Sequence, residues 1–198
     1  MSTPEVKVSG RVRISELLQD ESVPDAMYRR DGLLYAPLAI KGRVVDRFAI
    51  PVVPGFLPGI TLHDSKNLVT TLGRERVAEL IGGLSAAFID RIAVGDGGLF
   101  DGTSTPIPPR NDQTELLHEL VRLERKTVVV DVDIPSVTFV GIFKNVGSYQ
   151  FLQPGVAQIS EVGLLTQDNV LCAVYNFAPV PVDVHRLGFM VEWEWGVK

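Results

Sequence analysis

The sequence predicts a mainly β fold of the α+β class: an antiparallel sheet or sandwich with two helices on one side and an N-terminal β-rich arm. Residues 187–195 alternate apolar and polar side chains, which is typical of a strand with one buried face. A polar tetrapeptide, residues 166–169, separates two apolar runs and predicts a hairpin. Helical spacing of apolar residues occurs in two windows, which lie together between the strand-like segments.

The N-terminal part is expected to be distinct from the rest, with an arm or subdomain over residues 1–62 and a main domain over residues 63–198. Residues 33–40 and 44–50 are strand candidates, whereas the charged segment 19–30 is expected to be a loop. Residues 51–59 (PVVPGFLPG) are apolar without periodicity, so an extended arm of this kind must bury its side chains against something, often a neighbouring subunit.

The arm and the final strand supply the candidate oligomer interface. Trp193 and Trp195 continue an apolar row, so core filling or burial between subunits is favoured over exposure. The candidate interface residues are Pro51, Val52, Val53, Pro54, Phe56, Leu57, Pro58, Trp193 and Trp195.

The two helices are predicted from apolar spacing and end signals. The first spans residues 65–83, with Ser65 as its N-cap and Gly82-Gly83 as its stop. Its apolar face is formed by Leu68, Leu72, Val77, Leu80 and Ile81. The second spans residues 113–125, and Asp112 with Glu115 fits a capping box at its start.

The remaining strands are predicted from short apolar runs. They cover residues 89–94, 127–134, 137–146, 156–165, 170–177 and the final alternating segment. Between the first of them and the second helix lies a long loop at residues 95–109, rich in Gly, Pro, Asp and Thr. Residues 127–134 are a candidate sheet edge, where Asp131 and Asp133 would discourage uncontrolled pairing.

Composition narrows the class of protein. The 198 residues include 19 basic and 24 acidic side chains, a balance that argues against a nucleic-acid binder. Cys172 is the single cysteine, so no intrachain disulfide forms, and its apolar neighbours indicate a buried structural thiol. The N-terminus lacks the pattern of a signal peptide, and the longest uncharged apolar stretch, residues 48–62, is broken by prolines and glycines. We therefore expect a soluble protein made in a reducing cytosol, without a membrane partner.

Candidate chemistry is sparse. The turn Gly95-Asp96-Gly97-Gly98 lacks the lysine and the helix start of a phosphate loop, which favours a structural turn. Asp96, Asp101 and Thr103 offer oxygens for calcium, but the spacing does not fit an EF-hand. A solvated strand face explains Asp131 and Asp133 better than paired acid/base groups do.

The histidines and aromatic residues also do not form the pattern of a metal site or a binding site. His63, His118 and His185 are scattered and lack zinc-ligand spacing. A platform of Trp193, Trp195 and Phe100 for stacking sugars is the alternative to core filling. The sequence therefore predicts no catalytic residue, no cofactor-binding residue and no metal ligand.

Five segments occur in an order that resembles structural proteins of tailed bacteriophages, especially tail-collar fibre modules and related tail, baseplate and neck proteins. The segments are 66–74 (KNLVTTLGR), 92–98 (IAVGDGG), 111–120 (NDQTELLHEL), 159–166 (ISEVGLLT) and 191–195 (VEWEW). The resemblance covers residues 66–198, and no long fibrous extension follows it, so we expect a compact ring or collar subunit.

This resemblance implies a virion structural protein without catalytic activity, made in the host bacterial cytoplasm. It implies a homo-oligomer, expected as a ring, that docks other virion proteins of the tail or neck and takes part in virus assembly. Ring contacts are heterologous, so each subunit offers two different patches. Two rival hypotheses remain: a carbohydrate- or receptor-binding module using the Trp strand and the 95–109 loop, and a small hydrolase or isomerase in which Asp131, Asp133 or His118 converge in one pocket.

Overall fold

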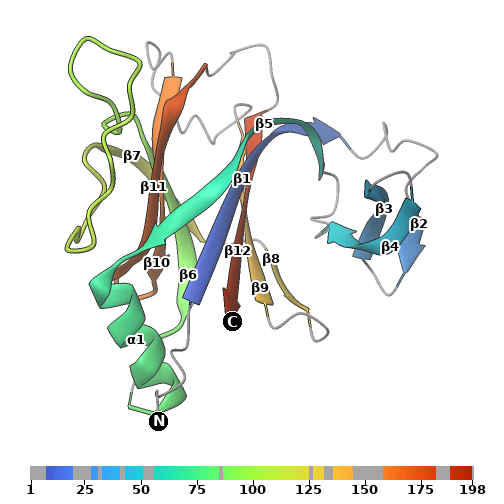
Figure 1. The fold of residues 1–198 in the computed structure, drawn as a ribbon, viewed down its shortest axis with the longest axis horizontal. Coiled ribbons are helices and arrows are strands. Elements are labelled where there is room, and N and C mark those ends of the chain that lie inside the picture. The colour runs from blue at the N-terminus through green and yellow to red at the C-terminus, as the bar shows by residue number, and fades with distance from the viewer. Residues whose placement is uncertain are drawn as a thin grey trace.

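The computed structural model describes residues 8–19, 28–30, 33–40, 43–50, 56–84, 87–124, 127–131, 136–144, 158–181 and 188–197. Within these residues the protein is mainly antiparallel β, with one helix (Figure 1). Nine strands form one sheet in the order β7-β6-β10-β11-β5-β1-β12-β9-β8. Their bounds are β1 Val8–Gln19, β5 Phe56–Val69, β6 Ile89–Gly95, β7 Glu119–Glu124, β8 Thr127–Asp131, β9 Ser136–Lys144, β10 Gln158–Thr166, β11 Leu171–Pro181 and β12 Gly188–Val197.

The N-terminal segment contributes to both sheets of the structure. A separate three-stranded sheet contains β2 (Tyr28–Arg30), β3 (Leu33–Ile40) and β4 (Arg43–Ile50), which confirms the two strands expected there. β1, in contrast, pairs with the C-terminal strand β12 and with β5 in the large sheet. The expected domain boundary at residue 62 thus falls inside β5.

The large sheet curls into a nearly closed, barrel-like form instead of a two-layer sandwich. Its two edge strands, β7 and β8, are separated in sequence by residues 125 and 126 alone, so the chain itself brings the edges together. β6 and β7 both contact β9 near the opposite edge. Gly141 on β9 permits this approach, since a Cβ there would lie 3.0 Å from Ile92 Cδ1 of β6.

The main core fills the inside of this curled sheet. On β12, Val191, Trp193 and Trp195 are buried on one face, as the alternation predicts. Val12 and Ile14 of β1 lie beside them in register. The other face of β12 is covered as well in this chain, because Met190 and Glu192 are buried.

The first predicted helix is confirmed with a later start. α1 spans Thr71–Ile81, and its N-cap is Thr70, whose side chain accepts a hydrogen bond from Gly73 N. Ser65 lies in β5 opposite Val12, because residues 56–69 complete sheet pairing before the helix begins. The expected stop is confirmed: Gly82 is the C-cap, and Gly83 follows with a φ of 68°.

The apolar face expected for this helix is only partly correct. Leu68 precedes the helix in β5, whereas Leu72 and Ile81 are exposed. Val77 packs against the main core. The helix attaches chiefly through Gly73, the helix residue that is buried, so its packing is by backbone approach more than by an apolar stripe.

The second predicted helix is wrong. Residues 113–118 are irregular, and Glu119–Glu124 form strand β7, in which Val121 pairs with Val94 of β6. The spacing of the leucines is compatible with a helix or a strand. The segment becomes a strand because it pairs with the open edge of the sheet at β6. Gln113 lies in this irregular segment, where its side chain donates a hydrogen bond to the Glu115 carbonyl.

The hairpin and the sheet edge are confirmed. β10 and β11 pair across the turn at residues 166–169, where Asn169 has a φ of 67°. β8 is the last strand of the sheet order, as expected for the edge candidate. No helix in the described part of the chain has the length and apolar character needed to cross a membrane.

Candidate functional site

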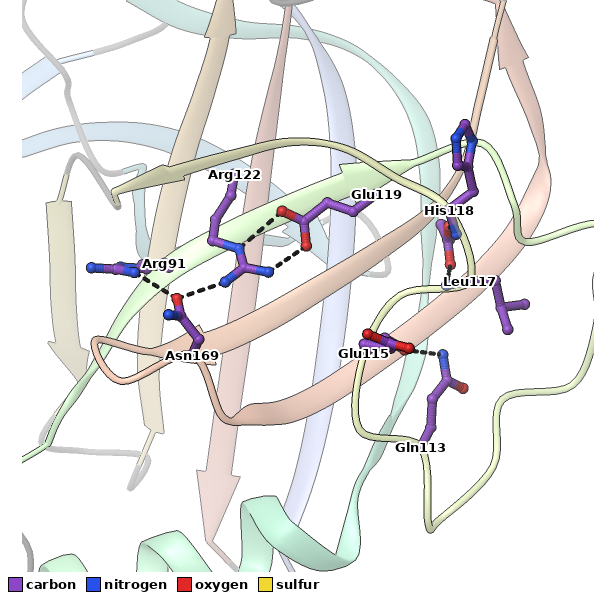
Figure 2. Close-up of polar contacts among 9 residues, drawn as sticks. Arg91, Gln113, Glu115, Leu117, His118, Glu119, Arg122 and Asn169 are labelled. Atoms are coloured by element: carbon purple, nitrogen blue, oxygen red, sulfur yellow. Dashed lines mark hydrogen bonds and ion pairs between the residues drawn. The ribbon is translucent and has the colours of Figure 1, made fainter.

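The most elaborate polar arrangement surrounds a loop, residues 96–118, that leaves β6 and returns as β7. The two strands are neighbours, so the ends of the loop lie close together beside β10 (Figure 2). Asp96 N donates to His118 O at 3.2 Å and closes the base of the loop. Gly95, at the end of β6, faces Glu161 of β10 in register.

Glu161 holds both ends of this loop with one carboxylate. Its Oε1 accepts from Gly97 N at 3.2 Å and from His118 N at 2.6 Å, and its Oε2 accepts from Leu117 N at 2.8 Å. The residue is fully buried. A buried carboxylate needs such donors, and here backbone amides supply them.

Glycines make this close approach feasible. A Cβ at Gly95 would overlap the His118 carbonyl, and one at Gly97 would lie 2.5 Å from His118 N. The Gly-Asp-Gly-Gly turn is therefore a backbone contact that side chains would prevent, not a phosphate-binding loop.

The electrostatics of the loop base couple three groups. Burial raises the pKa of Glu161 despite the hydrogen bonds from His118, Leu117 and Gly97, and the nearby charge of Asp96 adds to the rise. His118 Nδ1 pairs with Asp96 Oδ1, and the hydrogen bond and charge of Asp96 raise the pKa of His118. Both the imidazole and the aspartate remain accessible to solvent.

The rest of the loop is fastened to the outer face of the sheet. Ser160 Oγ accepts from Gly98 N at 3.1 Å, and Asn176 Nδ2 donates to Ile107 O at 2.8 Å. Leu116 packs in a second apolar cluster with Ala93, Leu165, Leu171 and Val174. Gly163 leaves room for it, because a Cβ there would lie 3.0 Å from Leu116 Cδ2.

The tip of the loop is a short turn that projects its side chains outward. Phe100 N donates to Thr105 O at 3.1 Å, and Thr103 donates back to Phe100 O through its backbone and its hydroxyl. Phe100 is 48% exposed. The structure gives no support for a calcium site in this loop. Asp96 pairs with His118 at the base of the loop. In the described residues, no group of three or more His, Cys, Asp or Glu side chains could hold a metal ion.

A second polar cluster locks the β10–β11 turn. Arg91 Nη1 and Arg122 Nη1 both donate to Asn169 Oδ1 at 2.6 Å, and Glu119 accepts two bonds from Arg122, as Figure 2 shows. From α1, Arg76 pairs with Asp168 at 2.9 Å. The turn is thus held by β6, β7 and the helix together.

The sequence-predicted residues are dispersed. Trp193 and Trp195 are 0% and 6% exposed in the core of their own chain, which removes them from a solvent-facing sugar platform and from a subunit interface. Phe56, Leu57 and Pro58 lie in β5, where their backbones pair with β1 of the same chain. Pro51, Val52, Val53 and Pro54 lie outside the described residues.

The remaining candidates do not converge either. Asp131 is the last residue of β8, whereas Asp133 and His185 lie outside the described residues. His63 lies in β5 opposite Ile14. Cys172 is buried as expected, and burial raises the pKa of its thiol to about 12, so it stays protonated at neutral pH.

Sequence reasoning missed the central role of Glu161. The available signal was a lone carboxylate inside an apolar strand, residues 159–165, since such a group is buried only where donors meet it. Comparisons with protein-family models, curated proteins and solved structures find no match for this chain.

Proposed function

We propose that this chain is a non-enzymatic structural subunit of a tailed-bacteriophage virion, in the tail, neck (collar) or baseplate. In this proposal it forms a homo-oligomeric ring and docks other virion proteins. The proposal rests on the ordered motifs in the sequence and on surface that the isolated chain leaves uncovered.

Exposed apolar side chains are the observation that carries the assembly role. Ile81 and Leu84, at the end of α1, are 82% and 83% exposed, and Phe88 shortly after them is 48% exposed. On the loop, Phe100 and Leu117 are about half exposed. Ile81, Leu84 and Phe88 are close together in the sequence, and exposed apolar side chains that lie together are typical of surfaces that another protein covers.

The motifs that resemble virion proteins have a mechanical role in this fold. The Gly-Asp-Gly-Gly segment begins at the last residue of β6, which pairs with β10, the strand of Glu161, and together the two segments fasten a projecting loop. Glu161 and Ser160 accept hydrogen bonds from the loop backbone, and Asp96 pairs with the side chain of His118 at the loop base. Because these motif residues hold a loop in position, they support a structural role in which the protein presents this loop.

The test is the size of the purified full chain. Mass photometry and light scattering should give a discrete multiple of the 21.7 kDa chain, and cryo-electron microscopy should show rotational symmetry. A monodisperse monomer over the accessible concentration range, together with absence from particles made with the gene intact, would contradict the proposal.

A receptor- or glycan-binding role is the second candidate, and the projecting loop tip with Phe100 is the observation that favours it. In that case Phe100→Ala should weaken binding on a glycan array, whereas Leu72→Ala, a change at an exposed helix residue, should not. Since both indoles are buried, tryptophan fluorescence should not respond to the glycan.

A further inference from the structure

The two ends of the 96–118 loop are joined by three ionisable groups. Asp96 begins the loop, His118 ends it, and Glu161 of β10 bonds to the backbone beside each of them. The Asp96–His118 side-chain pair spans the same gap as the backbone bond from Asp96 N to His118 O. Separating the ends of the loop therefore requires this pair to break.

Two acidic groups lie near His118 at this junction. The charge of Asp96 raises the pKa of Glu161, and the charges of both acids raise the pKa of His118. The neighbouring acid on β7, Glu119, is already engaged by Arg122. Within the described residues, the charges that act on His118 are those of Asp96 and Glu161, and protonated imidazole is the cation at this junction.

We propose that Asp96, His118 and Glu161 form a proton-dependent latch for the 96–118 loop, which is tightest while His118 is protonated and loosens when His118 loses its proton. A neutral imidazole still donates one hydrogen bond to Asp96, but the ionic attraction is lost. The positive charge that offsets the charges of Asp96 and Glu161 is then absent.

The direction of the effect follows from linkage. Asp96, and more weakly Glu161, raise the pKa of His118 in the closed form. A histidine with a raised pKa contributes stability below its ordinary value of 6.5, and this contribution is lost as the pH rises through the raised value. The loop should thus be held most tightly at mildly acidic pH and should open more often in mild alkali.

Solvent screening limits how strongly the protonation of His118 can change loop opening. Because the pair is exposed, it should change the opening equilibrium by about two- to fivefold, the range typical of exposed ion pairs. The Glu161 bonds and Leu116 packing keep the loop closed on average throughout. The latch therefore adjusts how firmly the loop tip with Phe100 is presented.

Hydrogen–deuterium exchange of the full chain tests this proposal. Opening of peptides that contain residues 96–98 and 117–118, corrected for intrinsic exchange, should increase about two- to fivefold from pH 6 to pH 8.5 relative to β10 peptides. His118→Gln should abolish this dependence, because glutamine keeps a donor but carries no charge. Asp101→Asn removes an ionisable side chain at the exposed loop tip, away from the latch, and as the control it should behave like the wild type.

A second readout separates the latch from general loosening. Exchange at the imidazole C2 carbon should report a His118 pKa above 6.5, and Asp96→Asn should return it towards that value. A loop that exchanges equally at both pH values, or His118→Gln that keeps the wild-type dependence, would overturn the proposal. Neither outcome depends on the oligomeric role proposed above.

Discussion

At the residue scale, Glu161 shows how one buried charge organises a long irregular segment. Carboxylates avoid the interior unless hydrogen-bond donors replace water. Here the donors are three backbone amides from the two ends of one loop, so the requirement of the charge and that of the loop backbone are met together. The strand sequence indicates that Glu161 needs donors, but neither segment alone shows which groups supply them.

Removing this carboxylate should weaken the fold. Glu161→Ala leaves three N–H groups at the loop base without their acceptor, which we expect to lower the free energy of unfolding by about 2–5 kcal/mol. Urea denaturation measures the loss, and faster exchange should be concentrated in residues 96–98 and 117–118. Glu115→Ala, at an exposed side chain in the same loop, should change stability by less than about 0.5 kcal/mol. Equal effects of the two variants would refute this account of Glu161.

At the element scale, α1 is placed by its first turn. Thr70 caps the helix and also donates to the Leu171 carbonyl at 2.6 Å, and Thr70 N donates to Cys172 O at 3.0 Å. Gly73 then lies directly against the Cys172 backbone. The helix is thus fixed to β11 at its N-terminal end, while its C-terminal end presents Ile81 to solvent.

Gly73→Ala tests this placement. Although alanine favours helices, its Cβ would overlap the Cys172 carbonyl, so we expect a destabilisation of about 2–4 kcal/mol. Gly82→Ala is the matched control, because a Cβ there would lie 3.3 Å from the Ala78 carbonyl and its φ of −75° suits alanine. Thermal unfolding of the two variants should show a lower midpoint for Gly73→Ala alone; a stabilised Gly73→Ala would show that the helix does not dock in this way.

At the scale of the whole molecule, charged groups combine to set the pH of greatest stability. Burial raises the pKa of Glu192 above 4.5, against the effect of Arg13, as it does for Glu161. Burial also tends to raise the pKa of Asp64, but the hydrogen bond and charge of Arg11, with help from Arg13, lower it below 3.8. The raised pKa values of Glu161 and Glu192 reduce stability as the pH rises, whereas the lowered pKa of Asp64 reduces stability as the pH falls.

We therefore expect maximal stability in mild acid. Groups with a raised pKa stabilise the fold below about pH 4.5 and lose this contribution as the pH rises through their folded values, whereas the Asp64 contribution is lost as the pH falls below 3.8. Urea unfolding should give a higher free energy at pH 5 than at pH 8 and a decline below pH 4. Glu192→Gln should flatten the change between pH 5 and pH 8; a wild-type maximum above pH 8 would contradict the assignment.

Assembly is the other property of the whole molecule. Leu84→Asp places a charge in the exposed apolar group that follows α1, so it should lower the oligomeric mass or raise the concentration needed for assembly at least tenfold. Mass photometry of wild type and variant measures this. Thr114→Asp, a charge of the same kind at an exposed loop residue, should assemble normally; loss of assembly in both variants would show that the Leu84 surface is not specific.

The predictability of this fold differs between its parts for a physical reason. Alternation over the last strand and the polar turn at residues 166–169 were sufficient to predict β12 and the β10–β11 hairpin, because a two-residue period and turn chemistry are local. The helix predicted over residues 113–125 is wrong, because its leucines suit a helix and a strand equally well, and pairing with strand β6 decides between them. Likewise, an apolar run does not reveal whether Trp193 faces a partner or its own core.

The pattern of residues predicts the mainly β fold, the strands from residue 127 onward, the first helix with its glycine stop, and the burial of Cys172. Three features depend on contacts between distant segments: the sheet curls on itself, both indoles lie inside it, and Glu161 fastens the 96–118 loop. The difference is one of range: side-chain periodicity acts between near neighbours, whereas sheet closure and carboxylate burial depend on groups that meet only after distant segments have paired.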